Sequence, residues 1–241
     1  MPANRSRLGR VSTWLGRLCV LGAILGPVLA HFEFVQPMTG FTIFAAGLAL
    51  GVLALALGLL ALALGPAPSR ASTAAGIIPP VVVIAAVLLT SSFSHGAPPI
   101  NDISTDTANP PQFVHAQTLD GNIGRDMSYS GEAYAAQQRA AYPDLMPVTL
   151  ALPPEQAFVQ VAAAARSMNS WVITREDAAS RTLEGYDTTP LFRFKDDFII
   201  EVRPTDNGQS IVQMRSKSRD GKSDLGANAA RIRAFLARLS N

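Results

Sequence analysis

The chain has 241 residues, 48% hydrophobic and only 16% charged, and its mean hydropathy of +0.21 is high for an ordinary soluble domain of this length. Five of the 20 basic and one of the 18 acidic residues precede residue 94, leaving 15 against 17 in the polar half, which does not favour a nucleic-acid partner. The lone Cys19 excludes an intrachain disulfide, a CxxC pair and a thiolate metal cluster.

Three apolar segments make residues 1–93 an expected transmembrane region. Residues 41–64 carry no charge in 24 positions, more than the ~20 that a helix needs to cross the hydrocarbon. Residues 76–93 are at the short end of that range, and Pro79 and Pro80 are expected in the first turn, where missing amide donors cost little. The sequence therefore predicts two or three membrane helices.

The first segment, residues 11–30, permits two interpretations. In one it is a spanning helix with Trp14 at the interface and Arg17 extending toward the headgroups. In the other it is a signal peptide, cleaved after Ala30, whose basic region is Arg5, Arg7 and Arg10. We favour the uncleaved helix, and the rest of the topology is the same in both cases.

The arginine distribution predicts the orientation. Four arginines lie at or before residue 17, the loop 31–40 has none, and the loop 65–75 has Arg70. Because basic residues gather in cytoplasmic loops, the N-terminus is expected in the cytoplasm and the polar half in the periplasm of a bacterial inner membrane. The lipid bilayer is then the first expected partner.

Residues 94–147 are rich in Pro, Asn, Asp and Gly, and we expect an extended arm that wraps the domain without forming its core. Asp102 and Asp106 lie in NDISTDTANPPQF (101–113), whose short acceptor side chains favour a rigid turn. A calcium loop needs a third acidic ligand and a glycine, so we expect no metal there.

Residues 148–241 predict an α+β domain. A helix over 153–168 follows a short strand at 148–152, and a last helix starts near Asp224. Between them lie four strand candidates, at 171–177, 181–189, 192–204 and 209–218. The expected fold is a curved antiparallel sheet of about five strands, in the order β-α-β-β-β-β-α, with helices on one face.

The turn TDNGQ (205–209) sets the register of the last two strands. For Val202 and Val212 to share the buried face, the loop must be Asp206–Gly208, with Gly208 in the left-handed conformation. The register then pairs the cations of the last strand with carboxylates, namely Lys217 opposite Asp197 and Arg215 diagonal to Glu201. We therefore favour a charged solvent face over an anion site along this strand.

The end of the last strand carries the candidate binding site. Arg219 and Lys222 have no evident partner except Asp220 and Asp224, and they precede a helix N-terminus, whose free amides favour anions. Two glycines, Gly221 and Gly226, allow close backbone approach. A small anionic ligand or an acidic partner fits this site, although a turn and a capped helix explain the same residues.

The sequence offers little catalytic material. Its three histidines, His31, His95 and His115, all precede residue 148, which disfavours a Ser-His-Asp triad or a histidine zinc site. Asp196 and Asp197 are consecutive on a strand and point to opposite faces, so they make a poor acid/base pair. We expect no cofactor and favour a protein without catalytic activity.

YPDLMP (142–147), FRFKDD (192–197) and RSKSRDGKSDLGANAARIRAFL (215–236) resemble the bacterial and plastid family of domain of unknown function 1499, over about residues 98–240. The resemblance implies an envelope or membrane-associated protein with no assigned activity. Many members carry Asn-Cys-Val-Ser-Ser near the domain start, where this chain has NDISTD (101–106), so no thiol role carries over.

Two hypotheses about function remain. The first is a membrane-anchored accessory or binding module with a periplasmic domain, acting on another envelope protein. The second is an enzyme or carrier for a small anionic or lipid-derived ligand, seated at the start of the last helix.

Overall fold

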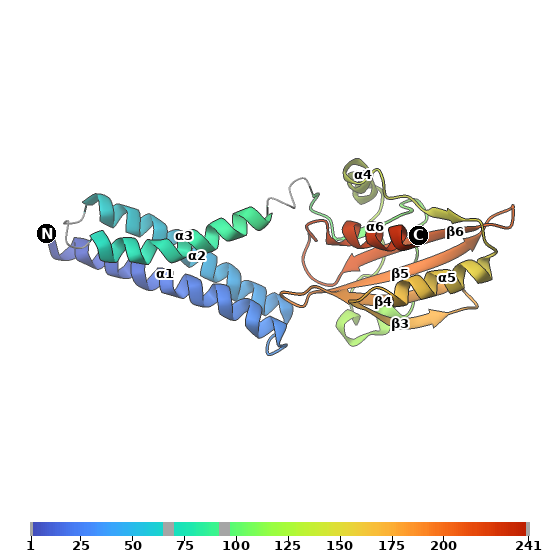
Figure 1. Ribbon diagram of the computed structural model, residues 1–241, viewed down its shortest axis with the longest axis horizontal. Helices are drawn as coiled ribbons and strands as arrows, with labels where there is room; N and C mark the ends of the chain where they lie inside the picture. The colour runs from blue at the N-terminus through green and yellow to red at the C-terminus, as the bar shows by residue number, and fades with distance from the viewer. Residues whose placement is uncertain (1, 65–69, 92–96, 240–241) are drawn as a thin grey trace. The chain divides into compact units, whose positions relative to one another are not determined.

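The computed structural model describes residues 2–64, 70–91 and 97–239 (Figure 1). These form two compact units. The helical unit contains the residues up to 95 together with Pro190–Arg193, and the sheet unit contains Gly96–Thr189 and Phe194–Asn241. The expected end of the third apolar helix at residue 93, and the expected start of the arm at residue 94, lie outside the described residues.

The helical unit consists of α1 (Pro2–His31), α2 (Pro37–Leu64) and α3 (Arg70–Ser91). Two stretches are long and apolar enough to cross a membrane, Arg7–His31 and Pro37–Leu64. The apolar part of α3 is shorter, Thr73–Leu89. This helix starts six residues before the predicted position, so Pro79 and Pro80 lie inside it and not in its first turn. A membrane helix tolerates such prolines because neighbouring helices and local adjustments satisfy the freed carbonyls.

Small residues bring the three helices together. Every buried residue of α2 is glycine or alanine. A Cβ at Gly22 of α1 would lie 2.9 Å from the Cα of Gly47 of α2, and a Cβ at Gly26 would lie 2.5 Å from the carbonyl oxygen of Gly40. The Ser12 hydroxyl donates to the Ala54 carbonyl oxygen at 2.8 Å. The backbones therefore approach closely along an extended seam, as in membrane helix pairs.

The sheet unit has six antiparallel strands, one more than predicted, in the order β1-β6-β5-β4-β3, with β2 also paired to β6. The sheet is open and uncurled, where a curved one was expected (Figure 1). The additional strand is β1, which pairs with the end of β6. The strands are β1 (Asp102–Ser104), β2 (Val148–Leu150), β3 (Trp171–Asp177), β4 (Thr182–Thr188), β5 (Lys195–Pro204) and β6 (Ser210–Ser218).

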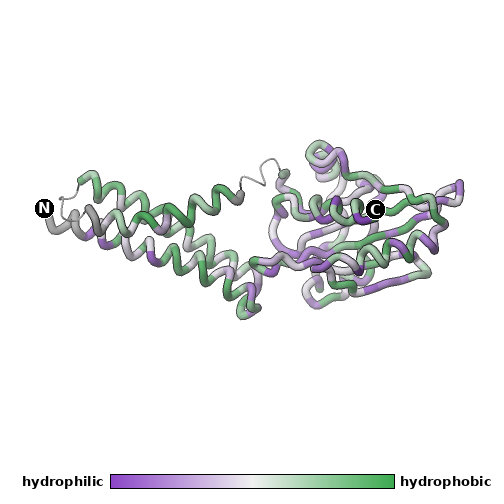
Figure 2. Tube along the Cα trace, viewed as in Figure 1, coloured by the Kyte–Doolittle hydropathy of each residue, from purple (hydrophilic) through white to green (hydrophobic). Residues whose placement is uncertain are grey.

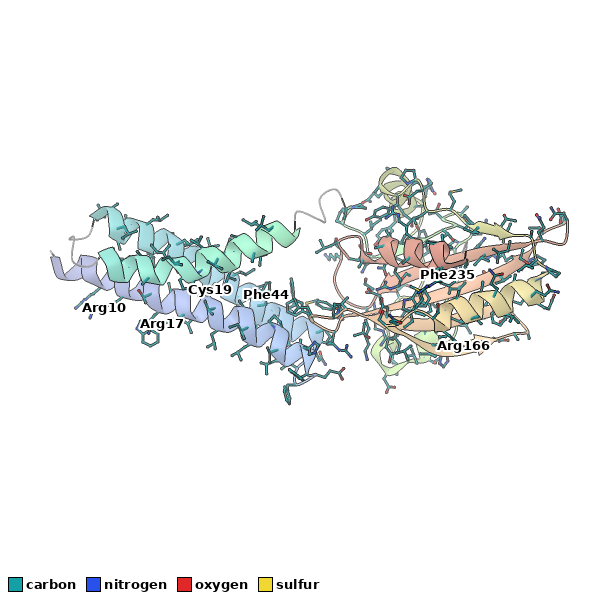
Figure 3. All side chains as sticks on the ribbon, viewed as in Figure 1. Arg10, Arg17, Cys19, Phe44, Arg166 and Phe235 are labelled. Carbon is teal, nitrogen blue, oxygen red and sulfur yellow. The ribbon has the colours of Figure 1, made fainter. Side chains whose placement is uncertain are left out.

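Two helices, α5 (Pro154–Arg166) and α6 (Ala227–Leu239), cover one face of the sheet, as predicted (Figure 1). The main core lies beneath them, and Phe235 of α6 points into it (Figure 3). Trp171 packs between Phe198 and Phe235, with ring centroids 4.1 and 5.4 Å apart. Figure 2 shows that apolar residues dominate the membrane-type helices, whereas polar and apolar positions alternate through the sheet unit.

The segment that was expected to form an arm is built into the sheet unit. It supplies β1 and a helix, α4 (Glu132–Ala141), and it contributes Ile100, Ile103, Tyr142 and Leu145 to the main core. Its middle part crosses the second face of the sheet through two short 3₁₀ helices, η3 (Ala116–Thr118) and η4 (Asp120–Asn122). There Phe113, Ala116 and Met127 pack on Ile199 of β5. The segment 105–130 is called the cover below.

Candidate functional site

The cations of β6 lie beneath the cover and not on a solvated face. Arg215 is fully buried and Lys217 is 9% exposed. The register is the one predicted, with Asp197 opposite Lys217 and Glu201 opposite Gln213, and Gly208 has a φ of 79°. The prediction of a charged solvent face was wrong because the cover closes this side of the sheet.

Asp102 of β1 is the counterion of two of these cations. Its carboxylate accepts two hydrogen bonds from Arg215, from Nε at 2.8 Å and from Nη2 at 2.7 Å, and one from Lys217 Nζ at 2.9 Å. The remaining donors reach carbonyl oxygens of the cover, at Pro111, Met127 and Ser128. The guanidinium also lies over the rings of Phe113 and Tyr129. Asp102 therefore holds a charge network, where the sequence suggested only a rigid turn.

Asp197, also fully buried, pairs with Arg219 and not with Lys217. Arg219 donates to Asp197 from Nη2 at 2.6 Å and from Nε at 3.0 Å, and Asn122 of the cover donates from Nδ2 at 2.9 Å. Arg219 also lies over the ring of Tyr186 at 5.1 Å. Such a bidentate, charge-assisted contact holds the Arg219 side chain in one geometry.

Glu184 of β4 anchors the first 3₁₀ turn of the cover. Its buried carboxylate accepts the backbone amides of Val114, His115 and Ala116, at 3.1, 2.8 and 2.7 Å. Consecutive amides at the start of a helical turn form a concave anion site, and a side chain of the same protein occupies this one. Sequence reasoning missed Glu184 because its only signal was an acidic residue at an inward position of a strand.

A second buried network lies on the helix-covered face. Arg231 of α6 donates to Asp196 at 2.7 Å and to Asp187 at 2.9 Å, and it also reaches Asn228 and Ser216. Asp196 and Asp197 therefore serve different networks on opposite faces, as their consecutive positions predicted. Arg231 was also missed; its signal was an arginine on the same helical face as Ile232 and Phe235.

The predicted anion seat at the start of α6 is occupied by Asp224. One carboxylate oxygen accepts the Gly226 amide at 2.8 Å and the other accepts the Asn228 amide at 2.9 Å. Burial raises the pKa of Asp224 above its ordinary value. Gly221 and Gly226 have φ values of 78° and 88°, so they serve the turn. Lys222 is exposed beside this turn, whereas Arg219 points to Asp197.

The other predicted residues have local roles. Glu201 pairs with Arg203 on its own strand at 2.8 Å and not with Arg215. Asp106 accepts the amides of Ala108 and Asn109, each at 3.0 Å, which makes a turn of the predicted kind. Asp106 also accepts a hydrogen bond from Gln213, which ties the turn to β6.

The chemistry that these networks permit is narrow. Asp102, Asp197 and Asp196 each have a cation within hydrogen-bonding distance, and Glu184 holds backbone amides. Within residues 2–64, 70–91 and 97–239, no group of three or more His, Cys, Asp or Glu side chains is placed to hold a metal ion. The buried groups therefore join the cover and α6 to the sheet.

Comparison with known families gives a match over the sheet unit. The family model described as "Protein of unknown function (DUF1499)" matches residues 102–239, which include both networks and all six strands. The chain belongs to the DUF1499 family. No curated protein matches the sequence. The DUF1499 region begins at Asp102, the residue that neutralises Arg215 and Lys217, and it ends at the last described residue of α6.

Proposed function

We propose that this DUF1499 protein is a membrane-anchored binding module without catalytic activity, whose sheet unit works on the periplasmic side of a bacterial inner membrane. The observation that carries the proposal is the distribution of small and large side chains in the helical unit. Its buried seam is lined mainly by small residues, whereas large apolar side chains such as Leu21, Ile24, Leu59 and Leu89 are 51–68% exposed. In water this arrangement would leave a very large apolar surface uncovered, and in lipid it is the usual one.

The interfacial residues of α1 fit a bilayer. Trp14, 64% exposed, lies beneath the guanidinium of Arg17, and Phe32 and Phe34 are 65% and 75% exposed after the other end of the helix. From residue 14 to residue 32 a helix rises about 27 Å, close to the thickness of the hydrocarbon core. Aromatic side chains at both ends of a span are typical of membrane interfaces.

The contacts of α1 support its retention in the mature protein. Gly22 and Gly26 pack directly on α2, and a Cβ at Gly16 would approach the backbone of α3 at Gly76. Removal of residues 1–30 would expose these glycine surfaces and leave the remaining pair without a third helix. With α1 retained, three crossings carry the sheet unit to the side opposite the N-terminal arginines.

The proposal of a binding role without catalysis is supported by the use of the buried charges. The carboxylates of Asp102, Glu184, Asp196 and Asp197 are buried and already contact cations or backbone amides, whereas acid/base catalysis needs a group within hydrogen-bonding reach of the substrate. The test is hydrolysis of ester, phosphate, glycoside and peptide substrates by the full chain in detergent, measured against temperature. An activity that belongs to this protein is lost at the temperature at which Trp171 fluorescence reports unfolding. An activity that is lost in this way contradicts the binding proposal.

Reporter fusions test the topology. Alkaline phosphatase joined after Asn241 is expected to be active in living cells, and green fluorescent protein at the same position is expected to remain dark, because the two reporters fold on opposite sides of the membrane. The opposite result contradicts the periplasmic placement. Equal amounts of both fusions in the membrane fraction provide the control for expression.

A further inference from the structure

Unpaired cations gather at one end of the sheet. Among the described Lys and Arg residues of the sheet unit, all but four are within 4.0 Å of a carboxylate. The four exceptions are Arg125, Lys195, Lys222 and Arg238. Arg125 and Lys195 lie near Arg219, Lys222 follows Arg219 by three residues in the chain, and Arg238 lies in the last turn of α6.

Contacts in the structure bring these cations together. The Arg219 amide donates to the Lys195 carbonyl oxygen at 2.9 Å, and the two side chains lie 5.0 and 5.1 Å from the ring of Tyr186. Their charges are thus no more than about 10 Å apart, a separation comparable to the Debye length of about 8 Å at physiological salt. Arg125 donates to the Asn122 side chain and, at 2.9 Å, to the Ser218 carbonyl oxygen, and Asn122 in turn donates to Asp197, so Arg125 lies beside the Asp197–Arg219 pair. Burial and, as a smaller cause, repulsion from Arg219 lower the pKa of Arg125.

The carboxylates in this region do not cancel the cluster. Asp197 is fully buried and is satisfied by Arg219 and Asn122, and the half-exposed Asp220 is the other acid that acts on Arg125. Asp197 balances Arg219, which leaves Arg125 and Lys195 with Asp220. The excess positive charge lies at the half-exposed side chains of Arg125 and Lys195 and at the exposed Lys222.

Within the cluster, the Arg219 side chain is held in one conformation before any ligand binds. Asp197 takes its Nε and Nη2, while the described residues supply no hydrogen-bond acceptor for Nη1. Gly121 lies directly beside this atom, since a Cβ on Gly121 would be 2.6 Å from it. Any other residue at position 121 would therefore crowd Nη1. The Arg219 side chain is 12% exposed, and a rigid guanidinium with an unbonded Nη1 beside the half-exposed Lys195 suits the oxygens of a phosphate group.

We propose that Arg219, Lys195 and Arg125, with Lys222 beside them, bind a phosphate group, either a lipid headgroup or a soluble phosphate ester. The lipid source rests on the proposed membrane anchoring of the chain. This assignment moves the anion site from the capped start of α6 to the cover side of the sheet.

Native mass spectrometry and calorimetry on the full chain in detergent test the assignment. The probes are inorganic phosphate, a short-chain phosphatidylglycerol and, as a neutral comparison, a short-chain phosphatidylcholine, all at equal ionic strength. The test variant is Lys195→Gln with Arg125→Gln, which leaves the Asp197–Arg219 pair intact. The matched control is Arg238→Gln, an equally unpaired cation remote from the cluster.

We expect binding of phosphatidylglycerol, phosphate or both, weakened roughly five-fold for each cation removed and unchanged in Arg238→Gln. Binding of phosphatidylglycerol alone assigns a lipid source, and binding of phosphate in addition or alone assigns a soluble ester. If neither probe binds, or if the test variant binds as the control does, the proposal is overturned. Each single variant repeats the measurement if the double variant melts early. A failure here leaves the reporter fusions unaffected, so it is distinguishable from a failure of the topology.

Discussion

Removal of the Asp102 charge is the sharpest test of the buried network. In Asp102→Asn the side chain keeps its shape, but Arg215 and Lys217 remain beneath the cover with no carboxylate between them. Breaking a buried pair by removing one partner costs about 3–5 kcal/mol, because the remaining charge is not compensated. For a unit of this size the loss lowers the melting temperature by roughly 6–20 °C.

The control for Asp102→Asn is Glu201→Gln, which removes the carboxylate that the sequence pattern paired with Arg215. In the structure Glu201 contacts Arg203, and the side chains are 24% and 37% exposed. A pair of this kind contributes about 0–1 kcal/mol. The buried network predicts a larger loss of stability in Asp102→Asn than in Glu201→Gln, whereas a solvated face with Glu201 beside Arg215 predicts the reverse order.

Trp171 supplies the assay, because it stacks in the core of the sheet unit between Phe198 and Phe235. In a Trp14→Phe background its fluorescence reports the urea unfolding of this unit alone. A triple variant, Asp102→Leu with Arg215→Met and Lys217→Met, is expected to recover most of the loss, since apolar groups often replace a buried ion cluster at little cost. A loss in Asp102→Asn no larger than that in Glu201→Gln would refute the network.

Three further predictions concern other parts of the chain. Gly22→Val forces α1 away from α2 and is expected to lower the melting temperature of the helical unit in detergent, while Leu21→Val on the exposed face is not; equal effects would contradict the glycine seam. Gly185→Ala sets a Cβ 2.6 Å from the Phe198 ring and is expected to cost about 1–3 kcal/mol in urea unfolding, and a neutral result would exclude overpacking there. Asp224→Ala removes a helix cap worth about 1 kcal/mol. Because the raised pKa keeps Asp224 protonated in the folded state at pH values where the unfolded chain has released the proton, its contribution falls as pH rises from about 3.8 through the folded pKa. The stability difference from wild type is therefore expected to grow toward low pH, and a difference that grows with pH would contradict this.

The sequence predicts what depends on periodicity and turn chemistry. The strand β3 has the predicted bounds, and the three-residue loop ending at Gly208 gives the predicted register of β5 with β6. The membrane-type helices follow from the length of their apolar runs. The start of α3 was missed because RASTAA (70–75) reads as a polar loop, although all six residues are compatible with a helix.

The charge pairing was not predictable from the same information. Register places residues opposite each other on neighbouring strands, so Asp197 was assigned to Lys217 and Glu201 to Arg215. A long side chain can instead pair with a residue of a third element that covers the sheet. Arg215 turns to Asp102, 113 positions away in the chain, and no pattern in either segment indicates the contact.

The chemistry of the cover explains why it reads as an unstructured arm. Only three of its side chains, Phe113, Ala116 and Met127, join the apolar cluster on Ile199. Much of the rest is held through its backbone, because Glu184 accepts its amides and Arg215 and Lys217 donate to its carbonyl oxygens. A segment held in this way needs no regular spacing of apolar residues, so its folded position depends on the charged residues of β4 and β6. The buried cations Arg215 and Lys217 therefore hold the cover against the sheet.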